Sequence, residues 1–69
     1  MTLTEYRNEI GWSQAELARH AGISNPTVSK AERGEGINSR SAILICKALT
    51  KELGRTIRPK DIEGLNVTT

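Results

Sequence analysis

The stretch that begins at Ser13 constrains the fold of this chain most strongly, because it specifies both ends of a short helix. The sequence Ser-Gln-Ala-Glu is a capping box. The hydroxyl of Ser13 accepts from the backbone N–H of Glu16, and the Glu16 side chain accepts from the backbone N–H of Ser13. Trp12 precedes the box as a hydrophobic staple for Leu17. Gly22 ends the helix, because glycine readily adopts the positive φ of a helix C-terminus.

A second helix start follows this stop almost at once. Ser24 or Asn25 is expected to be the N-cap, and Pro26 suits the first turn, where a missing N–H does no harm. Gly34 ends this helix. Residues 13–33 are therefore predicted to form two short helices joined by a sharp corner.

Small residues allow the two helices to cross closely at this corner. Ala18 occupies the crossing point, Gly22 permits the turn, and Val28 fills the space beneath the crossing. A helix, a tight turn and a second helix with this spacing of small residues form a helix-turn-helix motif. The alternative is a plain helical hairpin that binds protein.

Helical periodicity continues on both sides of this motif. Leu3 and Ile10 lie on one face of a short N-terminal helix. Residues 34–38 are predicted to form a loop, and Ser39 is predicted to cap a further helix that runs to about Leu53.

The tail, residues 55–69, matches no motif. Pro59 and the residues after it predict a last helical turn, followed by a frayed end at residues 64–69. Only weak signals suggest that residues 56–58 and 66–68 pair as strands.

The composition fits a small globular protein. The 69 residues form a single expected domain, residues 1–69. No apolar run is long enough for a membrane span, and no signal peptide is recognisable. The single cysteine, Cys46, excludes an internal disulfide and a multi-cysteine zinc site, and is expected to be a core residue. The net charge of +2 mildly favours a polyanionic partner.

From Ser13 to Gly34 the sequence resembles the Cro and phage-repressor class of helix-turn-helix proteins, the XRE family. The segments SQAELA, AGIS and TVSKAERG carry the resemblance, which extends over residues 3–53. It implies an all-α fold: a compact bundle of four to five helices, the lambda-repressor-like DNA-binding domain. In such a bundle the third helix enters the major groove of DNA and the second lies across the backbone.

The resemblance also implies which residues contact DNA. The start of the third helix would contact base edges, and the start of the second helix and the loop after the third would contact phosphates. The predicted base contacts are Ser24, Asn25, Thr27, Ser29 and Lys30. The predicted phosphate contacts are Ser13, Gln14, Arg33, Asn38, Ser39 and Arg40.

The chemistry of the third helix agrees with this reading. Asn25 can pair with the N6 and N7 atoms of adenine, Lys30 can donate to guanine, and Thr27 offers a methyl group to thymine. Pro26 departs from the family's frequent polar residue at that position and removes one potential base contact. The alternative is a solvated helix face.

Members of the family often pair an arginine of the first helix with a glutamate near the end of the third. Arg7 and Glu32 stand at the matching positions. The resemblance therefore implies a partly buried salt bridge between these helices, and the alternative is two independent surface charges.

The helix predicted from Ser39 carries more apolar residues than one face needs. Its inward stripe is complete without Ile43 and Leu44, which are expected to point away from it. Either the chain's own tail or a second subunit would cover them. The predicted dimer or partner surface consists of Ile43, Leu44, Ile57, Ile62 and Leu65.

These observations predict a transcriptional regulator that binds double-stranded DNA sequence-specifically, most plausibly a Cro-type repressor acting as a homodimer on operator half-sites. The alternative is an interaction module, such as an antitoxin-like or regulatory partner, that uses the apolar helix surface. No catalytic constellation appears, so an enzyme is not expected. Neither a metal, a cofactor, a small-molecule ligand nor a membrane is expected as a partner. The expected location is cytoplasmic, with the nucleoid.

Overall fold

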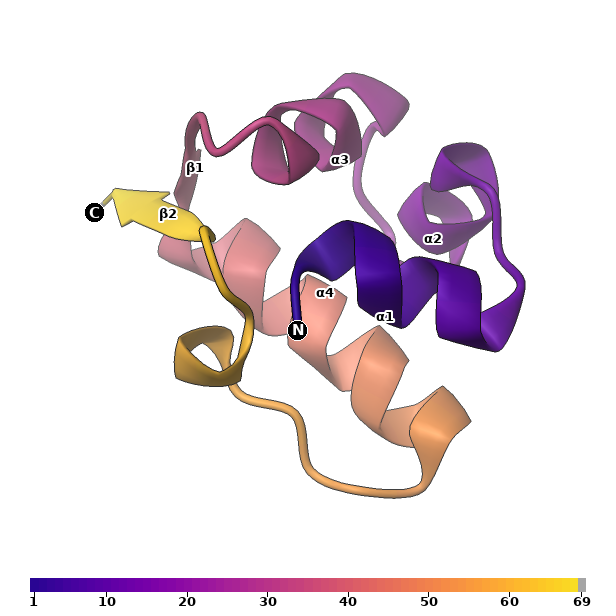
Figure 1. Cartoon of the computed structure of the whole chain (residues 1–69). Helices are drawn as coiled ribbons and strands as arrows, with labels where there is room; N and C mark the ends of the chain where they lie inside the picture. The colour runs from indigo at the N-terminus through magenta and orange to yellow at the C-terminus, as the bar shows by residue number, and fades with distance from the viewer. Residues whose placement is uncertain (69) are drawn as a thin grey trace.

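Four α-helices follow one another along the chain and pack around one core in the computed structural model, which describes residues 1–68 (Figure 1). The helices are α1 (Leu3–Ile10), α2 (Gln14–Ala21), α3 (Asn25–Glu32) and α4 (Ser39–Leu53), and the remaining elements are strands β1 (Gly36–Asn38) and β2 (Asn66–Thr68) and the 3-10 turn η1 (Pro59–Asp61). The predicted all-α fold is confirmed, with a small strand pair added to it. Within residues 1–68, no helix is both long and apolar enough to cross a bilayer.

Capping boxes start α1 and α2. At α2 the hydroxyl of Ser13 accepts from the backbone N–H of Glu16 at 3.1 Å, and the Glu16 carboxylate accepts from the backbone N–H of Ser13 at 2.9 Å, as predicted. Thr2 and Glu5 form the same reciprocal pair at α1. Both helices therefore begin at residues fixed by local sequence.

The other two long helices are capped by single side chains. The hydroxyl of Ser24 accepts from the backbone N–H of Thr27 at 3.3 Å, so the cap of α3 is Ser24 and not Asn25. The prediction that Ser39 caps α4 is wrong by one residue. Asn38 is the cap, because its backbone is extended and its side-chain oxygen accepts a backbone N–H of the first turn at 2.8 Å.

The corner between α2 and α3 depends on Gly22, whose φ is +74°. The N–H of Ile23 donates to the carbonyl of Ala18 at 3.0 Å, and the N–H of Gly22 donates to the carbonyl of Arg19 at 3.3 Å. This pair of bonds is a Schellman motif, which requires a left-handed residue at the position of Gly22. The predicted turn is confirmed.

The core forms where α2, α3 and α4 meet. The largest fully buried side chains are Leu17, Val28, Ile45 and Leu49. Ala18 is 4% exposed at the crossing, so a larger side chain would separate the helices.

Cys46 lies in this core with 5% of its surface exposed, as expected. Burial raises the pKa of its thiol to about 11, and the nearby charge of Asp61 acts in the same direction. The thiol is therefore protonated at neutral pH, and it behaves as an apolar group. No group of three or more His, Cys, Asp or Glu side chains within residues 1–68 is arranged to hold a metal ion.

The predicted loop at residues 34–38 and the predicted frayed end contain a parallel strand pair. Gly36, Ile37 and Asn38 align with residues 66–68, and Ile37 is 4% exposed. The prediction of a loop is wrong for β1, and the prediction of fraying is wrong for residues 64–68, whereas Thr69 lies outside the described residues. Strands this short have little preference of their own, and their pairing is decided by tertiary contacts.

Residues 56–58 do not pair with β2, in agreement with the weakness of the strand signals there. Ile57 is 5% exposed and contacts α4 instead, where its backbone N–H donates to the hydroxyl of Thr50 at 2.8 Å. The tail therefore folds back along α4 before it reaches β1.

This arrangement corrects the predicted partner surface. Ile57 and Ile62 are 5% and 4% exposed in the chain's own core, so their assignment to a partner surface is wrong. Leu44 and Leu65 are half-buried against the core, and Leu44 does not point away from it. Of the five predicted residues, Ile43 alone is largely exposed, at 48%.

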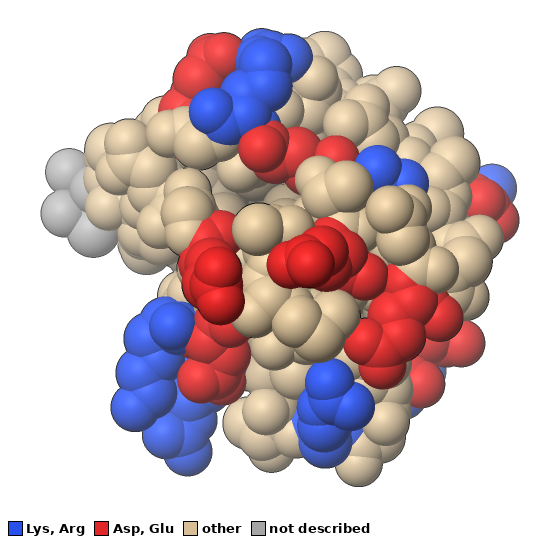
Figure 2. All heavy atoms as spheres, in the orientation of Figure 1, with Lys and Arg blue, Asp and Glu red and all other residues tan. Residues whose placement is uncertain are grey.

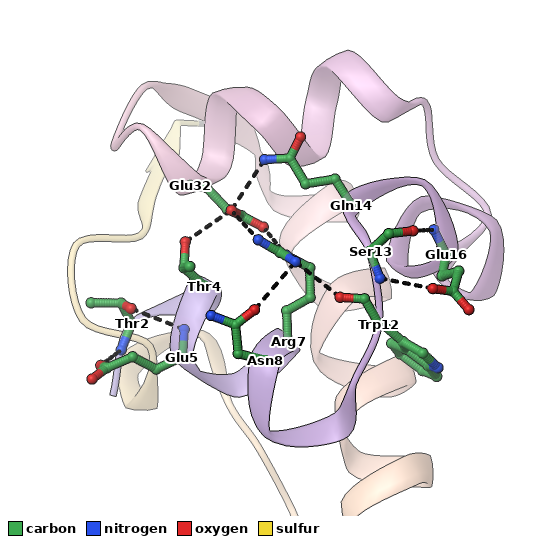
Figure 3. A network of polar contacts seen from close by, with 10 residues as sticks. All are labelled: Thr2, Thr4, Glu5, Arg7, Asn8, Trp12, Ser13, Gln14, Glu16 and Glu32. Atoms are coloured by element: carbon green, nitrogen blue, oxygen red, sulfur yellow. Dashed lines mark hydrogen bonds and ion pairs between the residues drawn. The ribbon is translucent and has the colours of Figure 1, made fainter.

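A hydrogen-bonded network centred on Glu32 joins α1, α2 and α3 (Figure 3). Arg7 forms the predicted salt bridge, from Nε to Oε2 at 2.6 Å and from Nη2 to Oε1 at 3.1 Å. Thr4 and the side-chain amide of Gln14 donate to Oε1 at 2.8 and 3.1 Å. The remaining guanidinium nitrogen of Arg7, Nη1, donates to the carbonyl of Trp12 at 2.9 Å. The side chains of Arg7 and Glu32 are 15% and 8% exposed.

The network keeps Glu32 ionised. Burial alone would raise the pKa of this carboxyl, but the hydrogen bonds from Arg7, Gln14 and Thr4 outweigh burial, so the pKa lies below its ordinary value. A lowered pKa in the folded state stabilises the fold above the pKa of the unfolded chain. This contribution is lost as the pH falls through the folded-state pKa.

Glu32→Gln tests this network. The amide cannot neutralise the partly buried guanidinium of Arg7, so we expect the free energy of unfolding to fall by up to about 3–5 kcal/mol. Urea denaturation followed by far-UV circular dichroism measures it.

The matched control is Glu35→Gln. It removes a carboxylate from an ion pair whose side chains are about half exposed, so we expect the urea midpoint to change little. Equal losses in the two variants would contradict a special role for the buried pair.

Candidate nucleic-acid interface

Helix α3 presents a polar row to solvent, because its apolar side chains face the other way. Val28 and Ala31 are 0% and 3% exposed in the core. Asn25 and Lys30 are exposed, and Ser29 between them is half-buried. The residues predicted to contact bases therefore lie outside the core, where a ligand can approach them.

A surface hollow of about 470 Å³ lies between this row and the start of α2. We call it the α3 hollow. It brings together five of the residues predicted to contact DNA, from two helices and the turn after them. Its lining consists of Gln14, Asn25, Pro26, Ser29, Lys30, Arg33 and Glu35.

The hydroxyl groups of Ser24 and Thr27, at the start of the row, already form hydrogen bonds within the protein. Their hydroxyl oxygens lie 2.7 Å apart, and Ser24 also accepts the backbone N–H of Thr27. Ser24 therefore has a structural role as a cap, whereas Asn25 and Lys30 have no side-chain hydrogen bond within residues 1–68.

The start of α2 is held in place by the Glu32 network. The side-chain amide of Gln14 donates to Glu32, and the hydroxyl of Ser13 accepts from α2 itself (Figure 3). The predicted phosphate contact Gln14 thus reaches the α3 hollow from a fixed position. Free N–H groups at a helix start favour an anion.

The turn after α3 carries a cation that is partly neutralised. Arg33 Nε lies 2.6 Å from the carboxylate of Glu35, and its guanidinium also donates to the hydroxyl of Ser29. The hydrogen bond from Arg33 lowers the pKa of Glu35, so the carboxylate is charged at neutral pH. Glu35 therefore competes with any phosphate for Arg33.

Asn38, Ser39 and Arg40 lie at the start of α4, and all three are exposed. The side-chain oxygen of Asn38 is used by the cap, whereas Arg40 lies outside the α3 hollow. These three predicted phosphate contacts are thus separate from the residues that line the α3 hollow.

Charge is unevenly distributed over the surface. On the face where α1 lies toward the viewer, acidic side chains gather at the centre and basic side chains lie toward the edges (Figure 2). A polyanion is repelled from such a face. The polar row on α3 is therefore a better place for DNA than the exposed side of α1.

Two residues of the site escaped sequence reasoning. Glu35 lies two positions after Arg33, and this spacing of opposite charges was an available signal. Thr4 lies one helical turn before Arg7 on α1, so both can reach the same partner.

Comparison with protein families assigns the chain to a known family. A helix-turn-helix family model matches residues 3–55, which includes all four α-helices. Comparisons with curated proteins and with solved structures found no match. With the capped corner and the exposed row on α3, the chain belongs to the helix-turn-helix family and is a DNA-binding transcription regulator of the XRE type.

Proposed function

We propose that the chain binds one operator half-site sequence-specifically, with α3 in the major groove of double-stranded DNA. The observation that carries this proposal is the α3 hollow, where Gln14 from α2 lies beside Asn25 and Lys30 from α3. A helix fits the major groove, and there each base pair offers a distinct pattern of donors and acceptors.

The exposed side chains of α3 suit this role. Asn25 offers both a donor and an acceptor to adenine, and Lys30 offers donors to guanine. Thr27 and Ser29 are half-buried, and their short side chains are proposed to contact base edges that lie close to α3. Ser24, the N-cap of α3, is proposed to contact bases beside them.

The flanks are proposed to bind phosphates. Ser13 and Gln14 lie at the start of α2, and Ser39 and Arg40 at the start of α4. Contacts of this kind fix the position of α3 in the groove and carry no sequence information themselves.

Occupancy of the operator is the proposed mode of regulation, as in a Cro-type repressor. Residues 1–68 fold around one core, and the tail contributes Ile57 and Ile62 to it. A domain of this kind, when bound to a promoter, would act by excluding other proteins from the same DNA. The cytoplasm is the corresponding location.

Two copies are proposed to meet on DNA at neighbouring half-sites about one helical turn apart. Self-association through α4 in solution is disfavoured by charge. Ile43, the remaining exposed residue of the predicted surface, is close to Arg40 and Lys47, which line the same hollow. A twofold contact would bring these cations together.

Lys30→Ala tests base recognition. We expect specific affinity to fall by about 1–3 kcal/mol and discrimination at one base position to relax, because a major-groove donor is lost. Selection from random duplexes identifies the site, and fluorescence anisotropy with that duplex measures the affinity.

Lys60→Ala is the control, because it removes the same exposed charge from η1, outside the α3 hollow. If both variants lose the same affinity without a change in base preference, Lys30 acts only through its charge.

Glu35→Gln tests the competition for Arg33. Without the carboxylate, Arg33 is free to bind a phosphate, so we expect tighter binding and a salt dependence that steepens by about 0.9 in log K against log salt. Binding isotherms at several salt concentrations measure the slope. An unchanged slope would show that Arg33 does not reach the DNA backbone.

Sedimentation tests the stoichiometry. We expect the free chain to sediment as a 7.6 kDa monomer, and a duplex with two symmetrical half-sites to bind two copies. A stable dimer without DNA, dissociated by Ile43→Asp, would contradict pairing on DNA.

A further inference from the structure

A second hollow lies on the side of α4 that faces the tail. Its volume is about 400 Å³, and its lining comes from α4 and residues 56–59. Ile43, Cys46 and Ile57 provide apolar side chains in this lining. The polar row on α3 contributes no residue to it.

This hollow continues along α4 toward the start of the helix. A neighbouring hollow of about 400 Å³ is lined by Ser39, Arg40, Ile43, Leu44 and Lys47, so the two share Ile43 and Lys47. Together they follow α4 from Ser39 to Lys51, a distance of about 18 Å at the rise of an α-helix. We call this surface the α4 groove, and its length equals about three turns of a bound helix.

The middle of the α4 groove is apolar and uncovered. Ile43, which belongs to both hollows, is 48% exposed, the highest value among the exposed large hydrophobic side chains of residues 1–68. Leu44 next to it is half-buried. Ile43 and Leu44 thus form a small apolar contact point, which is suited to a side chain from the apolar face of an amphipathic helix.

The charged side chains that line the α4 groove are all basic, although Asp61 lies close behind it and accepts from the backbone N–H of Arg58. Arg40, Lys47, Lys51 and Arg58 line the two hollows, and no aspartate or glutamate does. The whole chain has ten basic and eight acidic residues, so this segregation is local. A partner with carboxylates beside its apolar face would be complementary in charge.

Neither α4 nor α1 of a second copy offers such a partner helix. Two α4 grooves facing each other would bring like charges together. The acidic helix α1 exposes the polar residues Glu5, Asn8 and Glu9. Of its large apolar residues, Leu3 and Tyr6 are buried and Ile10 is half-buried against the core. It could meet the cations, but it presents no exposed large apolar side chain to Ile43.

We propose that the α4 groove binds an acidic amphipathic helix of another protein. The partner helix carries apolar residues at positions i, i+3 or i+4, and i+7, which contact Ile43 and its apolar neighbours. Its carboxylates lie opposite Lys47, Lys51 and Arg58. This binding is additional to DNA recognition. The two sites share Ser39 and Arg40 at the start of α4, and the rest of the α4 groove lies away from the α3 hollow.

Three helical probe peptides of 15 residues test the proposal, each held helical by lactam bridges and labelled with fluorescein. The first has leucines at i, i+3 and i+7 flanked by glutamates, the second has lysines in place of the glutamates, and the third has serines in place of the leucines. We expect the first to bind the full chain at least about tenfold more tightly than either of the others, measured by fluorescence anisotropy.

Variants of the full chain locate the site. We expect Ile43→Asp, and the pair Lys47→Ala with Lys51→Ala, each to weaken binding of the first peptide at least about tenfold. The matched control is Arg19→Ala with Lys60→Ala, which removes two exposed cations outside the α4 groove and should leave the affinity unchanged. Far-UV circular dichroism shows that each variant is folded.

Four outcomes would overturn the proposal. They are no binding of the first peptide, equal binding of the lysine-flanked peptide, equal loss of affinity in the control pair, and self-association that Ile43→Asp abolishes. None of them depends on whether the chain recognises DNA, so a failure here is distinct from a failure of base reading at Lys30.

Discussion

The carboxylate of Glu32 is the constraint on which the DNA-binding face depends. It accepts hydrogen bonds from Thr4 and Arg7 on α1 and from Gln14 on α2, while its own backbone belongs to α3. Three helices are thus oriented by one buried charge. Gln14 is both a partner of Glu32 and a wall of the α3 hollow, so the network sets the shape of that hollow directly.

A buried ion pair is a costly way to hold helices together, since both charges lose their hydration. Apolar packing in such a small domain gives limited stability and little directional control. A carboxylate with four donors fixes distances and angles that apolar contacts leave adjustable. The Glu32 network therefore fixes the orientation of α2 against α3 in addition to contributing to stability.

Local signals predicted the helices, and non-local contacts explain what the sequence left open. Capping at Ser13 and the turn at Gly22 involve neighbours within one helical turn, so both were predictable. The strand pair joins Ile37 to Val67, and no periodicity in three residues specifies a partner that distant. Whether the tail or a second subunit covers α4 was likewise undetermined, because an apolar side chain such as Ile57 fits either environment.

The same reasoning applies to the charges. A net charge of +2 predicts little, because the charges are segregated. Acidic side chains gather on the face of α1 (Figure 2), whereas Arg40, Lys47 and Lys51 line the α4 groove. Segregation of this kind gives a nearly neutral chain separate faces for separate partners. Arg40 takes part in two proposed sites, because it is a proposed phosphate contact and also lines the α4 groove. Anions at both sites would compete for one guanidinium, and by linkage each would then weaken the other's binding to the same extent.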